Sequence, residues 1–169
     1  MQERTFSLRA IAALIWAAAL VIAAPSSDVP ASAALLISAY PLIDAVSSFI
    51  AARWVNGAIS TLAAAALAVA TFGGDAGATL IVFGAWAVIS GAIQFRGARG
   101  WPMRVSGGLS VLAGLSFVAA HDEPRLSMLA GYAAVGAVLY FVATYRSRHA
   151  HAGGDRGRRA RRADARPAA

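Results

Sequence analysis

The sequence predicts an all-α membrane protein with six transmembrane helices arranged as three hairpin repeats. The first observation is composition: 59% of the 169 residues are hydrophobic and only 14% are charged, whereas about a quarter of the residues of soluble domains are charged. The second is arginine, which falls almost entirely in alternate gaps between six apolar runs. Short loops rich in basic residues stay on the cytoplasmic side, so both termini are expected in the cytoplasm.

The six apolar runs lie at about 8–24, 31–52, 54–71, 78–95, 101–120 and 127–145. At ~1.5 Å of rise per residue, helices of this length match the ~30 Å hydrocarbon core of a bilayer. The first run, with arginines before it, also resembles a secretory signal peptide, although Pro25 after the cleavage point disfavours cleavage. We therefore expect one transmembrane domain, residues 1–145, followed by a disordered arginine-rich cytoplasmic tail, residues 146–169.

Turn-forming residues separate the runs, and their charge differs between alternate gaps. The outward gaps are 25–30, the Gly73-Gly74-Asp75 turn and 121–125. Arginine occurs in them once, at Arg125. The inward gaps carry Arg53 and then Arg96, Arg99 and Arg104. Fifteen arginines and no lysine, in an alanine-rich chain, favour a bacterial source with a GC-rich genome and hence the inner membrane as the location.

An internal repeat is the third observation. A shift of 47 positions places Trp54 on Trp101, Gly84 on Gly131 and Arg99 on Arg146, and the first third fits more loosely at a shift of 46. Each repeat unit then holds two spans, so that successive units share one orientation in the membrane. The sequence predicts three hairpins that enter from the cytoplasm and return to it.

Two motifs carry a resemblance to a known family. One is the helix start from Trp101 through Leu109-Ser110 to Leu115, and the other is G-x-W-x-x-x-S-G-x-I-Q from Gly84 to Gln94. Over Trp54 to Arg146 the chain resembles the HdeD-like acid-resistance membrane proteins. The resemblance implies a six-span inner-membrane protein, linked in some members to acid or stress tolerance, and it supplies no enzymatic residues to transfer.

Asp44 is the acidic residue that lies inside an apolar run. It stands about nine positions before Arg53, hence ~13 Å from the cytoplasmic end of its helix. An ionised carboxylate at this depth costs about 2.5 to 3.5 kcal/mol. We therefore expect Asp44 to face the bundle interior, to be protonated or to have a partner. It is either the acceptor of a structural hydrogen bond or the proton or cation relay of a small transporter or channel.

The surroundings of Asp44 in the sequence define a possible intramembrane polar site. Pro41 lies one turn earlier and cannot donate an N–H, so it either only kinks the helix or exposes a carbonyl that helps to bind an ion. Candidate partners of Asp44 are Asn56, Arg9 and Arg104, among which the sequence does not choose. Arg104 is also placed to extend its side chain to the headgroups.

Small and polar residues recur at helical spacing in the second half of the chain. Trp86, Ser90 and Gln94 form a stripe that lines a pore or, alternatively, packs against another helix. Small residues allow the backbones of membrane helices to approach closely. Five of them are predicted helix-packing positions, within one chain or between the subunits of a homo-oligomer: Ser106, Ser110, Gly114, Ala87 and Gly91.

The remaining titratable cluster is the outward loop of His121, Asp122 and Glu123. Histidine changes charge in the mildly acidic range, so this loop is a candidate for a pH response, although an ordinary solvated loop is the simpler reading. Neighbouring residues rarely converge on one ion, so no metal and no cofactor is expected. Without cysteine or a hydrolase motif, the chain is predicted not to be an enzyme.

The arginine-rich tail is expected to contact the lipid bilayer. Six of its arginines lie within residues 156–166, and basic residues near an anionic leaflet contribute roughly 1 kcal/mol each. Nucleic-acid binding would normally add aromatic residues or a folded module, neither of which the tail sequence contains. The predicted partners are therefore anionic lipids and, in the bundle, a second copy of the chain.

Overall fold

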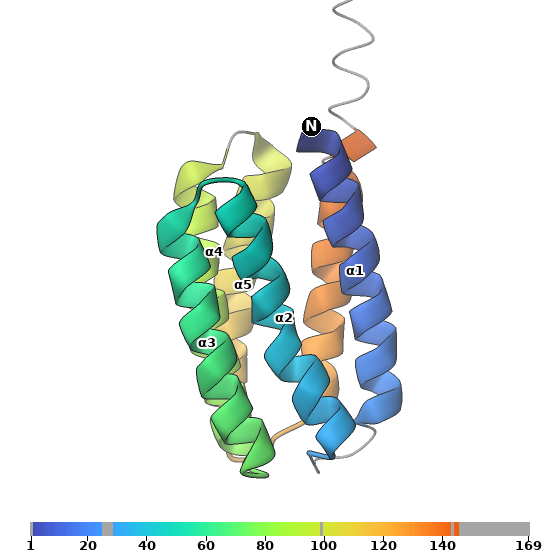
Figure 1. The fold of residues 1–169 in the computed structure, drawn as a ribbon, viewed down its shortest axis with the longest axis vertical. Helices are drawn as coiled ribbons and strands as arrows, with labels where there is room; N and C mark the ends of the chain where they lie inside the picture. Colours follow the sequence, from blue (N-terminus) through green and yellow to red (C-terminus); the bar gives the residue numbers. More distant parts are fainter. Residues whose placement is uncertain (1, 25–28, 99, 143, 146–169) are drawn as a thin grey trace, which may run out of the picture.

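The structure, a computed structural model, describes residues 2–24, 29–98, 100–142, 144 and 145, with side chains from Ala10 onward. The predicted tail and the side chains of Arg4 and Arg9 therefore lie outside the described residues. In the described part the protein is all-α, as predicted, and has six helices (Figure 1). They are α1 (Gln2–Ala23), α2 (Ala31–Ile50), α3 (Trp54–Phe72), α4 (Ala76–Gly97), α5 (Trp101–Ala119) and a last helix, Ser127–Val142.

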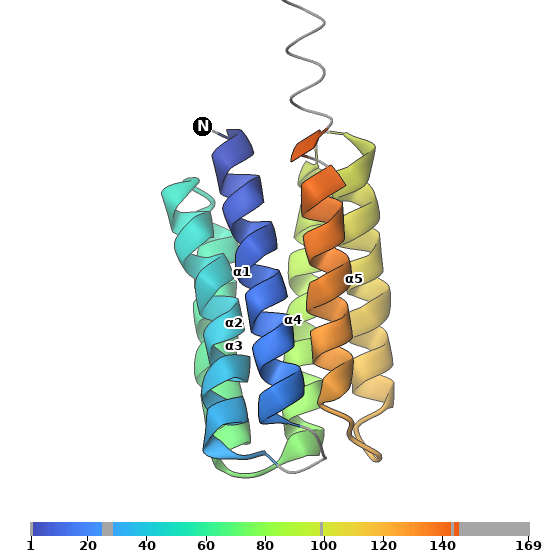
Figure 2. The same ribbon diagram turned by 90° about the vertical axis from the view of Figure 1, so that its right-hand side faces the viewer.

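The helices run up and down side by side as one antiparallel bundle. The N-terminus, the end of the last helix and the α2–α3 and α4–α5 loops lie at one end of the bundle, which we call the arginine end (Figures 1 and 2). The end of α1, the start of α2 and the α3–α4 and α5–last-helix connections lie at the opposite end. Arg53 and Arg96 belong to the arginine end, whereas Arg125 belongs to the opposite end. The alternation of arginine along the sequence thus becomes a separation of charge between the two ends.

The helix boundaries follow from local chemistry in the turns. Asp75 caps α4, because its carboxylate accepts a hydrogen bond from the N–H of Ala78 at 2.8 Å. The turn before it needs Gly74, whose φ is +74°. Gly100, with φ +99°, makes the corresponding turn before α5, and Pro102 occupies the first turn of that helix.

Two pairs of helices pack most closely, α4 with α5 and α2 with α3. Between α4 and α5 the backbones almost touch: a Cβ added at Gly84 would lie 2.5 Å from the carbonyl oxygen of Gly114, and one at Gly91 would lie 2.7 Å from that of Gly107. Each pair is joined by a loop at the arginine end. The predicted repeat units are instead the hairpins joined at the opposite end, so each of these close pairs takes one helix from each of two units. The repeat itself stays a prediction.

The first and last helices lie side by side although they are far apart in the sequence (Figure 1). Ala10 and Ala13 of α1 are buried against Ala137 of the last helix, with Tyr40 and Tyr140 packed around them. The bundle can therefore be described as three pairs of helices. This third pair completes the wall on one side of the cavity described below.

The centre of the bundle is a cluster of aromatic rings around Phe83. Its ring centroid lies 5.2 Å from that of Trp86, 5.8 Å from that of Tyr132 and 5.9 Å from those of Tyr40 and Phe117. Most of these contacts are tilted or edge-to-face, the geometry that aromatic pairs prefer. Four of the helices, α2, α4, α5 and the last, are fixed to one another at this point.

The distribution of polarity is the reverse of that in a soluble bundle. Large aliphatic side chains cover the outside, for instance Ile22, Ile50 and Val69, while Asn56 and Ser60 are buried. Four helices, α2 to α5, are long and apolar enough to cross a membrane, and Ala10–Ala23 and Ser127–Val142 form shorter apolar helices. An apolar surface of this extent needs lipid or protein to cover it, so the fold is that of a membrane-embedded helical bundle.

Candidate functional site

Asp44 is held by two side chains of the neighbouring helix α3. Its Oδ2 accepts a hydrogen bond from Asn56 Nδ2 at 2.7 Å and another from Ser60 Oγ at 2.8 Å. Asn56 and Ser60 are four residues apart, so they lie on the same face of α3. These two hydrogen bonds fix the position of the Asp44 carboxyl group inside the bundle.

The network continues from α3 to the helices on either side of it. Asn56 Nδ2 also donates to Ser48 Oγ of α2 at 2.8 Å. Trp86 Nε1 of α4 donates to Ser60 Oγ at 3.0 Å, which leaves the Ser60 proton for Asp44. Because Ser60 Oγ accepts from Trp86 and donates to Asp44, the network orients the carboxyl group from α3 and α4 together.

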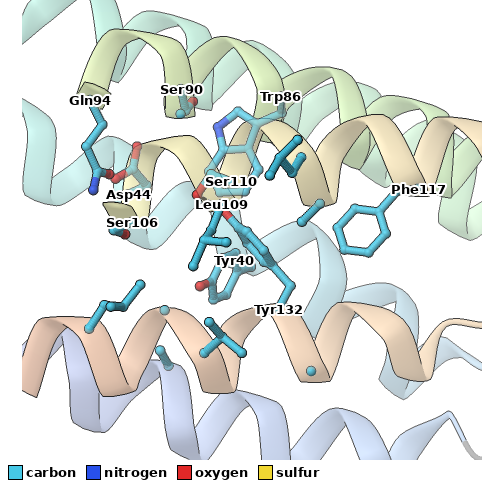
Figure 3. Close-up of a pocket in the computed structure, with 18 of the residues that line it drawn as sticks. Tyr40, Asp44, Trp86, Ser90, Gln94, Ser106, Leu109, Ser110, Phe117 and Tyr132 are labelled. Carbon is cyan, nitrogen blue, oxygen red and sulfur yellow. Dashed lines mark hydrogen bonds between the residues drawn. The ribbon is translucent and has the colours of Figure 1, made fainter. Parts of the chain in front are cut away.

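A cavity of about 600 Å³ lies next to this network. It is lined by α2, α4, α5 and the last helix, with Ala13 of α1 also in the lining. Figure 3 shows that Asp44, Gln94 and Ser106 lie toward one end of it and Phe117 toward the other. The end with Asp44 is the one nearer the arginine end of the bundle. The charged and amide groups of the lining are thus at one end, while Ser116 is the polar lining residue next to Phe117 at the other.

The structure brings together some of the residues of the predicted polar site and separates others. Asn56 is a direct partner of Asp44. Pro41 is buried one turn before Asp44 in α2, which continues through it. Arg104 is exposed near the start of α5, as expected for a side chain that reaches the headgroups, and Arg9 falls among the residues whose side chains are not described.

The polar stripe of α4 lies along the cavity, because Trp86, Ser90 and Gln94 all line it. Trp86 also donates to Ser60 of α3, so the stripe takes part in packing between helices, and a pore stays a prediction. Gln94 Nε2 also donates to the carbonyl of Met103 on α5 at 3.2 Å.

The five predicted packing positions lie at or near the contact between α4 and α5. Gly91 and Gly114 meet the backbone of the other helix, and Ala87 is fully buried. Ser106 and Ser110 are buried and line the cavity, where Ser110 Oγ accepts a hydrogen bond from Tyr132 Oη at 3.1 Å. The contacts are within one chain, and a homo-oligomer stays a prediction.

Sequence reasoning missed two residues of the site, Ser60 and Tyr132. The spacing of four residues between Asn56 and Ser60 was a signal for the first, because it places two hydrogen-bonding groups on one helix face. No comparable signal exists for Tyr132, whose partner Ser110 belongs to another helix. Its position depends on how the last helix packs.

The loop of His121, Asp122 and Glu123 lies at the opposite end of the bundle from Asp44. His121 Nδ1 lies 2.9 Å from the carbonyl oxygen of Val118, and its Nε2 lies 3.2 Å from Asp122 Oδ1. The Asp122 side chain is 86% exposed. Among the described residues no group of three or more His, Cys, Asp or Glu side chains is placed to hold a metal ion.

Fold and site together define an all-α membrane-type bundle with a carboxylate on the wall of an internal cavity. Comparison with models of known protein families, with curated proteins and with solved structures finds no match to this chain. The function therefore has to be argued from the cavity and its polar end.

Proposed function

We propose that the protein is a non-enzymatic integral protein of the bacterial inner membrane, and that within this class it acts as a small proton-linked transporter. The observation that carries the proposal is the place of Asp44, which lines the cavity and is also bonded by Asn56 and Ser60. A carboxyl group inside a membrane bundle is costly to keep and commonly marks a proton or substrate pathway. A purely structural hydrogen bond would not need to be at a cavity wall.

The proposal includes six membrane spans with the arginine end in the cytoplasm. Helices α2 to α5 have the length and apolarity for this, and α1 and the last helix run alongside them (Figure 2). The positions of Arg53, Arg96 and Arg104 at one end support the orientation through the preference of basic loops for the cytoplasm. The tail would then contact anionic lipids of the inner leaflet.

The cavity suggests how proton binding and substrate binding could be coupled. Asp44 can change its charge by taking up a proton, and this changes the electrostatics of the polar end of the cavity. Pro41 cannot donate a hydrogen bond to the carbonyl one turn earlier in α2, so this helix is the one best suited to local movement beside Asp44. Acid or stress tolerance, which the HdeD-like resemblance implies, stays a prediction, as does a pH response of the His121 loop.

The test is proton flux in proteoliposomes of the full chain with an imposed pH gradient and an entrapped pH-sensitive dye. We expect the wild type to carry protons above protein-free vesicles and Asp44→Asn to fall to the level of those vesicles. The matched control is Asp75→Asn, because Asn preserves the cap of α4 and lies outside the cavity, so its flux should equal wild type. Equal flux in wild type and Asp44→Asn, or none in wild type, would contradict the proposal.

A further inference from the structure

We infer that the cavity is a binding site for a neutral amphiphile drawn from the bilayer, with a hydroxyl-type head at the Asp44 end and an apolar chain toward Phe117. This deepens the proposed function by naming the substrate class and rests on it for the role of that binding. The argument depends on four features of the cavity: its shape, its polarity, one unsatisfied hydroxyl and its opening.

The cavity extends along the bundle axis. On α5 the lining extends from Ser106 to Phe117, and the eleven steps of ~1.5 Å between these two residues span about 16 Å. On the last helix, which runs antiparallel to α5, the lining extends from Met128 to Tyr140. A cavity of this form takes an extended chain better than a compact solute.

The polarity changes from one end to the other (Figure 3). Asp44, Ser90, Gln94 and Ser106 supply hydrogen-bonding groups at the end near the arginine end, whereas Phe117 lies at the other end. Apart from Asp44, the polar groups among these lining residues are uncharged. A head that both donates and accepts hydrogen bonds, as a hydroxyl does, matches this mixture.

Ser90 provides the unsatisfied hydroxyl. Its Oγ is buried and has no hydrogen-bond partner among the described residues. This is unusual within the bundle, because Thr61, Thr71 and Thr79 each donate to the carbonyl four residues earlier in their own chain, the ordinary solution for a hydroxyl in a helix. A buried hydroxyl without a partner costs about 1–3 kcal/mol. Ser90 lines the cavity, so a rotamer that turns its Oγ into the cavity would let a ligand head remove this cost.

The opening lies between α5 and the last helix. Leu112 and Val135 line the cavity and are 64% and 49% exposed, so the cavity reaches the apolar outer surface of the bundle there. Gly131 and Gly136 also line it, and a Cβ added at either would meet nothing within 4 Å. A route that begins among exposed aliphatic side chains admits a molecule from the lipid phase.

Brominated probes test the inference, because bromine quenches tryptophan fluorescence on contact and Trp86 lines the cavity while being only 5% exposed. The full chain in vesicles is titrated with ω-bromododecanol. The control probe is bromododecane, which has the same chain length and no hydroxyl group. We expect saturable quenching by the alcohol, absent in Trp86→Phe, and only non-saturable quenching by the alkane. Ser90→Ala should weaken alcohol binding about fivefold, the equivalent of one hydrogen bond.

Variants that fill the cavity decide the location of binding. Gly131→Leu and Gly136→Leu place a side chain in open space and should each abolish the saturable phase, whereas Gly97→Leu, also in open space but at the exposed end of α4, should bind like wild type. Saturable quenching that persists in both filled variants, or saturation by the headless alkane at equal affinity, would overturn the inference. Because the titration uses no proton gradient, binding without flux would contradict the transporter proposal alone.

Discussion

Replacement of Gly84 by valine is expected to destabilise the bundle by about 3 kcal/mol or to prevent its folding. The first added carbon would lie 2.5 Å from the carbonyl oxygen of Gly114 and 2.9 Å from Val118 Cγ2. The nearest of these atoms belongs to the backbone, so α4 and α5 would have to separate along their length. Loss of helical signal during titration of detergent-solubilised protein with SDS, followed by circular dichroism, measures the effect.

The matched control for Gly84→Val is Gly131→Val. The two glycines correspond in the 47-residue repeat, and both substitutions introduce a β-branched residue into a helix. A Cβ at Gly131 meets nothing within 4 Å, so this variant should stay within about 1 kcal/mol of wild type. Equal losses for both variants would mean that helix propensity, and not the contact between α4 and α5, determines the result.

Replacement of Asn56 by leucine is expected to lower the free energy of unfolding by about 2 kcal/mol. It removes the bonds of 2.7 Å to Asp44 and 2.8 Å to Ser48. A bond to a charged group contributes about 1.5–3 kcal/mol in soluble proteins, but side-chain bonds between membrane helices average only about 0.6 kcal/mol. The expected value lies between these, because the loss also leaves the Asp44 carboxylate with one fewer donor. The same SDS titration measures it.

A double-mutant cycle separates this bond from general packing. Asp44→Leu combined with Asn56→Leu should cost clearly less than the sum of the two single variants, because the double variant leaves neither a buried carboxyl group nor a buried amide without the other. Thr61→Val is the control on the same helix, since Thr61 is exposed and bonds only the carbonyl of Gly57, and it should change stability by no more than about 0.5 kcal/mol. Additive losses at Asp44 and Asn56 would contradict a direct interaction.

The helices could be predicted from the sequence because their signals are local. The apolar runs at 54–71 and 101–120 agree closely with α3 (Trp54–Phe72) and α5 (Trp101–Ala119). Glycine and aspartate in the 73–75 turn determine where α3 ends and α4 begins. The first helix is longer than its apolar run, since α1 begins at Gln2 and includes charged residues. Hydropathy alone locates the membrane part of such a helix and not its true start.

The sequence limits the partner of Asp44 to a few candidates but does not identify it. Asn56, Arg9 and Arg104 all lie toward the same end of the bundle, and the choice depends on the rotation of each helix about its axis. The short loop between α2 and α3 brings Asn56 and Ser60 against Asp44, whereas Arg104 lies exposed on α5. Helix rotation is determined by packing between helices, which a single sequence does not contain.

The cavity could not be predicted, because a glycine at a helix contact and a glycine beside a cavity look the same in the sequence. Gly84 and Gly131 correspond in the repeat, yet Gly84 is covered by Gly114 and Gly131 faces open space. The stripe of Trp86, Ser90 and Gln94 was consistent with either a pore or a packing face. Only the position of the last helix relative to α5 distinguishes these alternatives.

Single-cysteine labelling tests most directly the claim that six helices cross the membrane with the arginine end inside. The chain has no cysteine, so Gly97→Cys at the arginine end and Glu123→Cys at the opposite end, both exposed positions, give unique targets without other changes. In spheroplasts of a bacterial host, a membrane-impermeant maleimide should label Glu123→Cys alone, and both variants after permeabilisation. Labelling of Gly97→Cys in sealed spheroplasts would contradict the orientation and the arrangement of the six helices in the membrane.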